Sequence, residues 1–497
     1  MDLFSIIFYL GIYYVRPHDW IHLFKMLPII KVTFLMLILT VYHKNQGQLW
    51  KQMLRTPHDW LMFFYMLWII FTSGQPYTTF KLIYSLFAIY FLTVVTLNTT
   101  KKIQTLLNWW TVWIVVLAAF AVASKFGFDP TGSYDLTMGL MKGRLAFNTS
   151  IFNNANALGH SIVPAIVMLY FIAFWQRPVF IRITTGALMA IPLYCVYATE
   201  SKGAFLTGAT ILLVAVTFRR PIIIQILIFV FSLTVGVAAV QLLPRMQELE
   251  SAKSNEAIQG RVAAFHFGMD SMKSKVAGVG WGRFEISLYK ELRFWKAPHS
   301  SYVRVGGEMG WIGLAMFLGL MYCCCRTLLF ARTDNDDEER IRRTLFVILV
   351  SFAVSSWMVG WNDRVIFFLM VAATGAFHRC LIEKRIGQSV AETSGNQFAS
   401  ISSPQPSALP AVTIAPPLTL PTPPPIGNVA TPNNEILVTT AHSNDQDHKK
   451  TMSESAEELF SFLAGIKWNR LGIVDIVLIA LITQATVYFW QYIMTKM

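Results

Sequence analysis

The chain has 497 residues, of which 54% are hydrophobic and 14% are charged, and its formal net charge is +13. With a mean hydropathy of +0.48, it has too little polar surface to cover a soluble globule of this size. This composition excludes a water-soluble enzyme and indicates an integral membrane protein.

Apolar stretches near the length of a membrane-crossing helix recur along the sequence. They predict an all-α, polytopic membrane protein with about 12–13 transmembrane helices. The first stretch has no small-residue cleavage site, so we interpret it as a retained anchor and not as a signal peptide. The expected spans lie at roughly 3–15, 28–42, 60–74, 79–97, 108–124, 157–175, 180–199, 204–218, 221–243, 306–329, 344–361, 365–382 and 473–494.

Basic residues are concentrated in every second connection between these spans. The positive-inside rule places those connections, and the N-terminus, in the cytoplasm. The long loops at roughly 125–156 and 244–305 then face the outer side. Most of the positive charge is thus expected to meet anionic lipid headgroups and not nucleic acid. The inner basic residues are Lys44, Lys51, Arg55, Lys101, Lys102, Arg177, Arg182, Arg219, Arg220, Arg326, Arg332, Arg340, Arg342, Arg343, Arg379, Lys384 and Arg385.

The pattern divides the chain into regions. Residues 1–385 form the expected transmembrane core, which includes the outer loop 244–305. Residues 386–470 are rich in Pro, Ser and Thr and are predicted to be a disordered cytoplasmic linker. Residues 471–497 then add a last membrane helix. None of the five cysteines lies in an outer loop, so the sequence predicts neither a disulfide framework nor a spaced metal-binding pair.

The tetrapeptide Pro-His-Asp-Trp occurs twice, at 17–20 and at 57–60. The predicted topology puts the two copies on opposite faces of the membrane. Proline, a capping aspartate and an interfacial tryptophan are together typical of the start of a membrane helix. We therefore interpret both copies as structural.

Four groups of polar residues are expected at outer helix ends. The first runs from Lys142 to His160 and includes Arg144 and Asn154, and the second is the turn at Lys202. The third begins at Arg261 and runs to Glu285, and the fourth is the segment 298–313. Chemistry is expected where these groups meet the helix ends.

His299 is the most informative residue of the fourth group. It stands just before two candidate capping serines, Ser300 and Ser301, so its imidazole is expected near the amino end of the next helix. The helix macrodipole disfavours a second positive charge there. A histidine in this place is predicted to be neutral and able to accept a proton.

Each group also has an ordinary structural interpretation. Turn and cap chemistry accounts for the asparagines, and a lysine that reaches for water at the interface accounts for Lys202. A solvated amphipathic helix accounts for the basic residues between 261 and 283. A single histidine at a helix end is commonly structural as well.

The order of these groups favours a shared site. An asparagine-bearing loop, a Ser-Lys-Gly turn, a Gly-Arg start followed by GVGWG, and Pro-His-Ser-Ser-Tyr before Gly-Glu-Met-Gly-Trp-Ile-Gly resemble the O-antigen ligase and polymerase superfamily of bacterial inner membranes. Residues 261–313 carry the most specific part of this resemblance. Ser300 stands where the family usually has asparagine, and it still supplies a cap. Lys202 stands where arginine is expected, so the charge is kept but the bidentate phosphate contact is lost.

The resemblance implies a GT-C-type glycosyltransferase that moves a preassembled glycan from undecaprenyl diphosphate to a hydroxyl acceptor at the periplasmic face. Arg261 and Lys202 would bind the departing diphosphate, because the reaction expels a multiply charged anion. His299, with a pKa near neutrality, would take the proton of the acceptor. Supporting roles are expected for Ser300, Tyr302, Glu308, Arg144 and Asn154, with Glu308 orienting a neighbour or capping a backbone amide.

Three functions stay open at this point. A ligase would attach the glycan to lipid A core or, in related enzymes, to serine or threonine of a protein. A polymerase would use two lipid-linked substrates and two basic sites. A transporter would line its pathway with ionisable residues inside the spans, whereas these residues are expected at outer helix ends. We expect inversion by direct displacement, with no metal and no other cofactor, because the outer loops have no close carboxylate pair.

Overall fold

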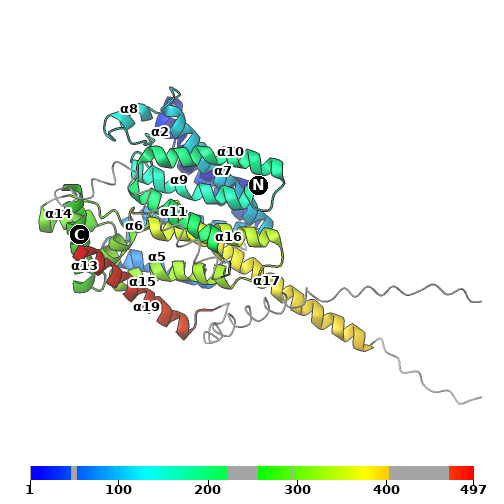
Figure 1. Cartoon of the computed structure of the whole chain (residues 1–497). Helices are drawn as coiled ribbons and strands as arrows, with labels where there is room; N and C mark the ends of the chain where they lie inside the picture. Colours follow the sequence, from blue (N-terminus) through cyan, green and yellow to red (C-terminus); the bar gives the residue numbers. More distant parts are fainter. Residues whose placement is uncertain are drawn as a thin grey trace, which may run out of the picture. The chain divides into compact units, whose positions relative to one another are not determined.

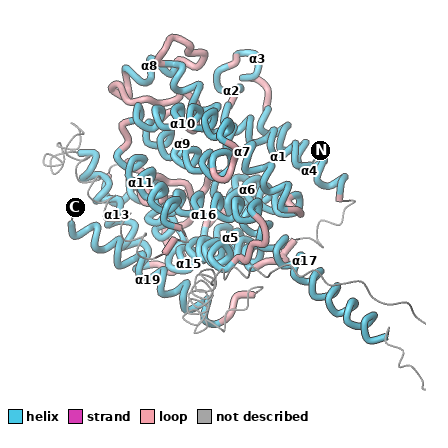
Figure 2. The backbone as a smooth tube through the Cα atoms, turned by 45° about the vertical axis from the view of Figure 1, so that its right-hand side comes forward, coloured by secondary structure: helices cyan, strands magenta, loops and turns pink. Residues whose placement is uncertain are grey.

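The computed structural model describes residues 2–45, 53–218, 220–221, 256–293, 295–401 and 470–496. Within these ranges every regular element is a helix and none is a strand (Figure 2). Seven of the described helices are long and apolar enough to cross a membrane. The chain is therefore an all-α, polytopic membrane protein, as its composition predicts.

The described helices coincide with twelve of the thirteen expected spans, and the remaining one, 221–243, lies outside the described residues. In chain order they are α1 (Asp2–Val15), α4 (Ile29–Lys44), α5 (Pro57–Thr72), α6 (Pro76–Thr96), α7 (Thr100–Ser124), α9 (Ala155–Leu169) with its π-helical continuation (Tyr170–Phe174), α10 (Val179–Thr199), α11 (Lys202–Thr217), α15 (Ser301–Phe330), α16 (Asp336–Ser355), α17 (Val365–Ile401) and α19 (Ile473–Lys496) (Figure 1). The five that are not among the seven long apolar helices are α1, α4, α5 and α11, which have 14–16 residues, and α16, whose first half is charged.

The chain divides into two compact units, residues 1–383 with 468–497 and residues 384–467. Only the beginning of the second unit is described, as the helical residues of α17 up to Ile401. The helix therefore continues past residue 386, where the linker is expected to start. Residues 402–469, which make up most of that expected linker, lie outside the described residues.

Further helices, from four to nineteen residues long, occupy the connections at one end of the first unit. We call this end, at which α9, α11 and α15 begin, the site end. Its connections contain α2 (Pro17–Trp20), α3 (His22–Lys25), α8 (Ser133–Met138), α13 (Glu256–Ser274) and α14 (Phe284–Leu292) (Figure 1). The expected outer loop at 244–305 is thus built around α13 and α14.

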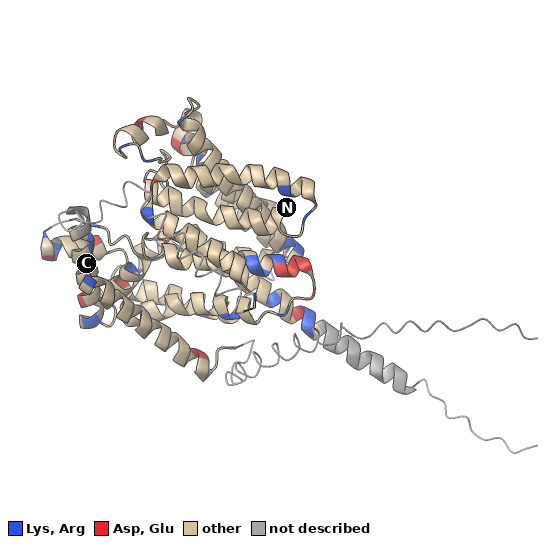
Figure 3. Cartoon of the chain, viewed as in Figure 1, with Lys and Arg blue, Asp and Glu red and all other residues tan. Residues whose placement is uncertain are grey.

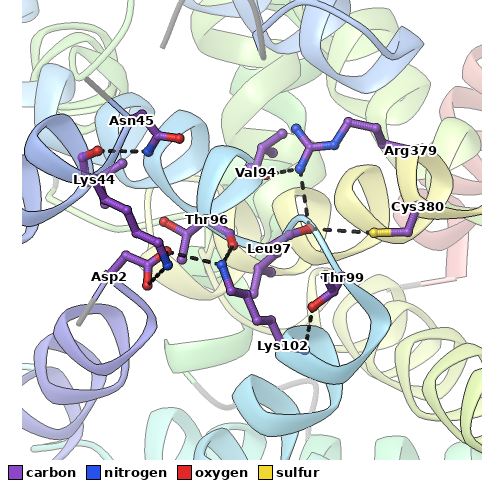
Figure 4. A network of polar contacts seen from close by, with 11 residues as sticks. Asp2, Lys44, Asn45, Val94, Thr96, Leu97, Thr99, Lys102, Arg379 and Cys380 are labelled. Atoms are coloured by element: carbon purple, nitrogen blue, oxygen red, sulfur yellow. Dashed lines mark hydrogen bonds and ion pairs between the residues drawn. The ribbon is translucent and has the colours of Figure 1, made fainter. Parts of the chain in front are cut away.

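The opposite end of the first unit is held by charged contacts (Figure 4). The Asp2 carboxylate, which is 4% exposed, lies 2.8 Å from Nζ of Lys44 and 3.2 Å from Nζ of Lys102. Arg379 donates to the carbonyl oxygen of Val94 at 2.7 Å. Coloured by charge, the helices are uncharged over most of their length and carry their charged residues toward their ends (Figure 3). This is the distribution expected of helices that cross an apolar layer.

The two Pro-His-Asp-Trp copies have different structures. The second copy begins α5, where Thr56 and Asp59 form a capping box. The first copy forms only the four-residue helix α2, so its interpretation as the start of a membrane helix is wrong. The reason is tertiary: Asp19 bonds to Arg16 and to Ser150 of a distant loop instead of capping a longer helix.

Helix α19 packs along α15 although more than a hundred residues separate them in sequence. Toward its start, Asp475 accepts from Nη1 of Arg326 at 2.7 Å and from the Tyr322 hydroxyl at 2.8 Å. Toward its end, Trp490 is fully buried and reaches α13. The last helix is therefore an integral part of the first unit.

Candidate active site

The segment before α15 is fixed by its two serines. Ser300 is the N-cap of α15, where its Oγ accepts from the amide of Val303 at 3.4 Å and donates to the carbonyl oxygen of Ser356 at 3.2 Å. Ser301 donates to the carbonyl oxygen of Val359 at 3.0 Å. The start of α15 is thereby attached to the connection between α16 and α17.

His299 immediately precedes this cap and has a left-handed backbone, with φ of 49°. Its side chain is half-buried. Burial lowers its pKa to about 4, with further lowering by the positive charges of Arg261, Lys296 and Arg304. The imidazole is therefore neutral at physiological pH. The pKa is lower than the near-neutral value expected from sequence, first because the ring is buried and second because three cations lie near it.

Arg261 comes from the second turn of α13 and is brought to His299 by the packing of α13 on α15. The two helices approach closely because glycines line the contact. A Cβ added at Gly307 would lie 3.2 Å from Cα of Gly268 and 2.7 Å from the ring of Phe284. Sequence reasoning selected both Arg261 and His299, and the structure places Arg261 near enough for its charge to lower the pKa of His299.

Glu308 holds the GVGWG turn that follows α13. Its carboxylate accepts from the amide of Phe284 at 3.4 Å, and its carbonyl oxygen accepts from the amide of Gly280 at 2.8 Å. The side chain is 1% exposed. The contact of the carboxylate with the Phe284 amide is the amide capping that the sequence leads us to expect of Glu308.

The same turn requires a break in α15. Gly310 has φ of 67°, and a Cβ there would lie 1.9 Å from the carbonyl oxygen of Val276. At Gly278, with φ of 61°, a Cβ would lie 2.4 Å from the carbonyl oxygen of Gly307. These glycines let the turn approach the helix backbone, so they fix the start of α14 next to the site.

Tyr302 lies on the inner side of the site and not within it. Its hydroxyl donates to the carbonyl oxygen of Ala353 at 2.8 Å, and its ring packs on Trp357. The residue is 4% exposed. Its supporting role is to join α15 to α16.

A second group of predicted residues surrounds the start of α11. Arg144 donates to the carbonyl oxygen of Thr199 at 3.1 Å and to Oδ1 of Asn156 at 2.6 Å. Asn154 caps α9 by accepting from the amide of Asn156 at 2.8 Å. Asn154 therefore caps a helix, as its ordinary structural interpretation predicts. Asn156, through Arg144, is also linked to the end of α10.

Lys202 is the first residue of α11 and its side chain is exposed. Ser201 caps the helix by accepting from the amide of Ala204 at 3.3 Å. A Cβ at Gly203 would lie 2.7 Å from Sδ of Met358 and 2.7 Å from Nε2 of His160. The Ser-Lys-Gly turn is thus packed against the connection between α16 and α17.

That connection, residues 356–364, joins the two groups. Ser356 binds the serines before α15, Met358 contacts the Lys202 turn, and a Cβ at Gly360 would lie 3.8 Å from Nε of Arg304. Asn362 is 3% exposed, and its Oδ1 has no hydrogen-bond partner among the described residues. Sequence reasoning missed this connection, because its role depends on contacts with segments far away in the chain.

Two basic residues of the site were also missed. The positive charges of Lys296 and Arg304 both lower the pKa of His299, and Arg304 forms an ion pair with Glu285 of α14. Arg304 could have been found from helical spacing, since it lies one turn after the Ser300 cap. Lys296 carries no such signal. In the part of the chain that the structure describes, no three His, Cys, Asp or Glu side chains cluster as metal ligands would.

One stretch of the chain is similar to a known protein family. Residues 187–318 match the family model described as O-antigen ligase. This stretch contains Lys202, Arg261, His299 and Glu308, whereas Arg144 and Asn154 precede it. No curated protein matches the sequence of the chain. The similarity to this family is therefore confined to residues 187–318, the stretch that carries most of the site residues selected from sequence.

Proposed function

We propose that this membrane protein, which carries the O-antigen ligase family stretch at residues 187–318, transfers a preassembled glycan from a polyprenyl diphosphate to a hydroxyl acceptor. The observation that carries the proposal is the neutral, half-buried His299 within the field of Arg261, Lys296 and Arg304. One residue that can accept a proton thus stands beside cations that can bind the leaving group. Undecaprenyl diphosphate is the donor carrier that the resemblance implies.

The cations serve the leaving group. Breaking the bond between the anomeric carbon and the diphosphate oxygen leaves a multiply charged anion, and preorganised cations stabilise that charge as it develops. Arg261 presents a planar guanidinium suited to two phosphate oxygens. Lys202, at the amino end of α11, adds a second positive position where the helix dipole also favours an anion.

His299 serves the acceptor. The acceptor hydroxyl forms its bond to the anomeric carbon while its proton passes to the imidazole, and the electron pair of the broken bond stays on the diphosphate. A pKa of about 4 describes the site without substrate. A bound diphosphate would offset the three neighbouring cations and raise the pKa of His299, which makes the imidazole a stronger base when the donor is present. Direct displacement of this kind inverts the anomeric centre.

The lead assignment is a ligase that acts at the periplasmic face of a bacterial inner membrane. The acceptor would be a sugar of lipid A core or a serine or threonine of a protein. The charge distribution supports this orientation, because Lys44, Lys102 and Arg379 gather at the end opposite the site. The transfer is proposed to need no metal.

The polymerase remains the second candidate, and one observation favours it. The basic residues of the site form two groups, Arg261 with Lys296 and Arg304 on one side and Lys202 with Arg144 on the other. A polymerase, whose donor and acceptor both carry a diphosphate, would use two such groups. A ligase whose acceptor lacks a diphosphate needs only one.

Purified full-length protein tests the chemistry with a polyprenyl-diphosphate-linked glycan as donor. His299→Ala and Arg261→Ala are expected to abolish or strongly reduce transfer while membrane insertion stays normal. Transfer at the wild-type rate by both variants would refute the site. A chelator is expected to leave transfer unchanged. Loss of transfer in the presence of the chelator would refute the metal-free mechanism.

Glycan profiling of a deletion strain separates the candidate functions. Unligated lipid-linked polymer would indicate a ligase for lipopolysaccharide. Single-repeat capping would indicate a polymerase, and loss of protein glycosylation would indicate transfer to protein. A deletion strain in which lipopolysaccharide ligation, polymer length and protein glycosylation are all unchanged would refute the proposed function.

A further inference from the structure

A polar cavity lies at the site end, outside the residues assigned above. It has a volume of about 540 Å³ and is formed between α2 and α3 on one side and residues 130–153 of the segment before α9 on the other. His18, Asp19, Trp20, Thr149 and Asn153 are among the residues that line it. The cavity therefore uses the first Pro-His-Asp-Trp copy, which the fold does not use to start a membrane helix.

The two walls of the cavity are joined by Asp19. Its Oδ2 accepts from Nε of Arg16 at 2.6 Å, from the amide of Ser150 at 2.8 Å and from Oγ of Ser150 at 3.0 Å. Opposite this carboxylate, Asn148 donates to the carbonyl oxygen of Thr131 at 2.9 Å. The cavity is thus built by specific polar contacts between segments more than a hundred residues apart.

Two buried polar atoms in the lining have no partner. Thr149 is 3% exposed, and among the described residues its Oγ1 makes no hydrogen bond. Nδ1 of His18 is likewise buried and unpartnered there. A buried polar group without a partner costs roughly 1–3 kcal/mol. A ligand hydroxyl that reached either atom would remove that cost there.

The lining selects a class of ligand. Hydroxyl, amide and imidazole groups stand beside the indole of Trp20, and the charge of Asp19 is offset by Arg16. Such a surface suits a polyhydroxylated, mostly uncharged molecule, whose hydroxyls both donate and accept. A lipid chain does not fit a lining this polar. Among the described residues that line the cavity, Lys25 is the one fixed cation that a diphosphate would meet, and the neighbouring Arg16 is already paired with Asp19.

We propose that this cavity is a saccharide-binding subsite, which holds sugar residues of the glycan at a distance from the reacting bond. The inference rests on the proposed function for its source of ligand. The loop that supplies Thr149 and Asn153 also supplies Arg144 and Asn154 to the Lys202 group. Sugars bound in the cavity would therefore be held by the same loop that contacts the diphosphate group. They belong to either the donor or the acceptor, and both have the same polyhydroxyl chemistry.

Direct binding to full-length protein in detergent tests the subsite. The probes are two soluble oligosaccharides: the repeat unit released by mild acid from the polyprenyl-linked glycan of the host, and the core oligosaccharide released from its lipid A. The test variants are Thr149→Val, which removes only the hydroxyl, and Asn153→Ala, which alters an exposed side chain. Thr184→Val, on the exposed face of α10, is the matched control.

We expect the wild type and the control to bind one of the two oligosaccharides equally well. Each test variant should bind it about tenfold more weakly, which is the loss of about one hydrogen bond. The oligosaccharide that binds identifies the source, since the repeat unit represents the donor and the core represents the acceptor. The Michaelis constant for that same substrate should rise about tenfold, with kcat unchanged.

The proposal is overturned if the wild type binds neither oligosaccharide, or if both test variants bind like the control. If Thr149→Val fails to fold, Asn153→Ala still tests the proposal, because the Asn153 side chain is exposed and its removal should not disturb folding. The proposed function fails separately, if wild-type protein transfers no glycan. The binding measurement then still decides whether the cavity holds a saccharide.

Discussion

Trp490, seven residues from the end of the chain, lies against Gly268, which follows Arg261 by about two helical turns. A Cβ at Gly268 would lie 3.1 Å from Cζ2 of this indole, and a Cβ at Gly306 would lie 3.1 Å from its Cζ3. The indole therefore fills the seam between α13, which carries Arg261, and α15, which follows His299. The last helix thus sets how closely these two site helices approach.

This contact predicts that Trp490→Ala impairs transfer from a distance. Removal of the indole leaves a void between α13 and α15, so the position of Arg261 relative to His299 is no longer fixed. We expect kcat/KM for the donor to fall at least tenfold while the protein still inserts into the membrane. Trp490→Phe, which keeps a ring in the seam, should retain most activity. Equal activity of Trp490→Ala and wild type would show that α19 does not position the site.

The site could be predicted from sequence where local chemistry decides it. Ser300, Ser201 and Asn154 all cap helices, and a cap depends on residues within one turn. The contact of Trp490 with Gly268 could not be predicted, because no periodicity relates residues so far apart. The connection at 356–364 was missed for the same reason.

The charged and titratable residues of the site likewise divide into those that local sequence identifies and those that only folding brings to the site. Arg261 and His299 were selected because each stands in an informative motif. Lys296 lies in the loop without such a motif, yet it contributes to the lowered pKa of His299. The near-neutral pKa expected from sequence took account of the helix dipole alone, whereas folding buries the ring and also brings cations near it, and both lower the pKa.

The low pKa of His299 predicts a shift of the pH profile. Burial lowers this pKa to about 4, and the charges of Arg261, Lys296 and Arg304 contribute. A cation disfavours the imidazolium, so Lys296→Gln should raise the pKa. If the neutral imidazole is the base, the acid limb of kcat/KM against pH lies near pH 4 in the wild type and moves to higher pH in the variant.

The control for this profile is Lys273→Gln, which removes an exposed charge at the last turn of α13. Its acid limb should coincide with that of the wild type. Superimposable profiles for all three proteins would mean that protonation of His299 does not limit the reaction.

The break in α15 predicts a strong effect of Gly310→Ala. A Cβ there would lie 1.9 Å from the carbonyl oxygen of Val276, in a backbone with φ of 67° that an L side chain rarely adopts. We expect a large loss of folded protein, measured as a lower Tm and a lower yield in size-exclusion chromatography. Gly208→Ala, in α11, meets open space and should leave both unchanged or slightly improved. Similar behaviour of the two variants would contradict the structure of this turn.

The buried ion pair of α19 predicts an asymmetry between single and double variants. Arg326 and Asp475 are 1% and 0% exposed, with Nη1 and Oδ1 2.7 Å apart. Asp475→Ala leaves a buried guanidinium without its carboxylate and should destabilise the protein by roughly 3–5 kcal/mol. The double variant Arg326→Met, Asp475→Leu removes both charges and should recover much of the lost Tm. Equal losses in the single and double variants would show that the pair does not hold α19 in place.

Lys202 provides the last prediction, because this position has lysine where the resemblance leads to arginine. Its exposed side chain stands at the start of α11, where an anion is favoured. Lys202→Arg keeps the charge and adds a fork that binds two phosphate oxygens, so the Michaelis constant for the donor should stay the same or fall. Lys202→Gln removes the charge and should raise that constant about tenfold, with a smaller effect on kcat, because a charge-assisted contact contributes roughly 1.5–3 kcal/mol. Steady-state kinetics with a polyprenyl-diphosphate-linked glycan measure both variants, and a complete loss of transfer in Lys202→Arg would show that the lysine does not bind phosphate.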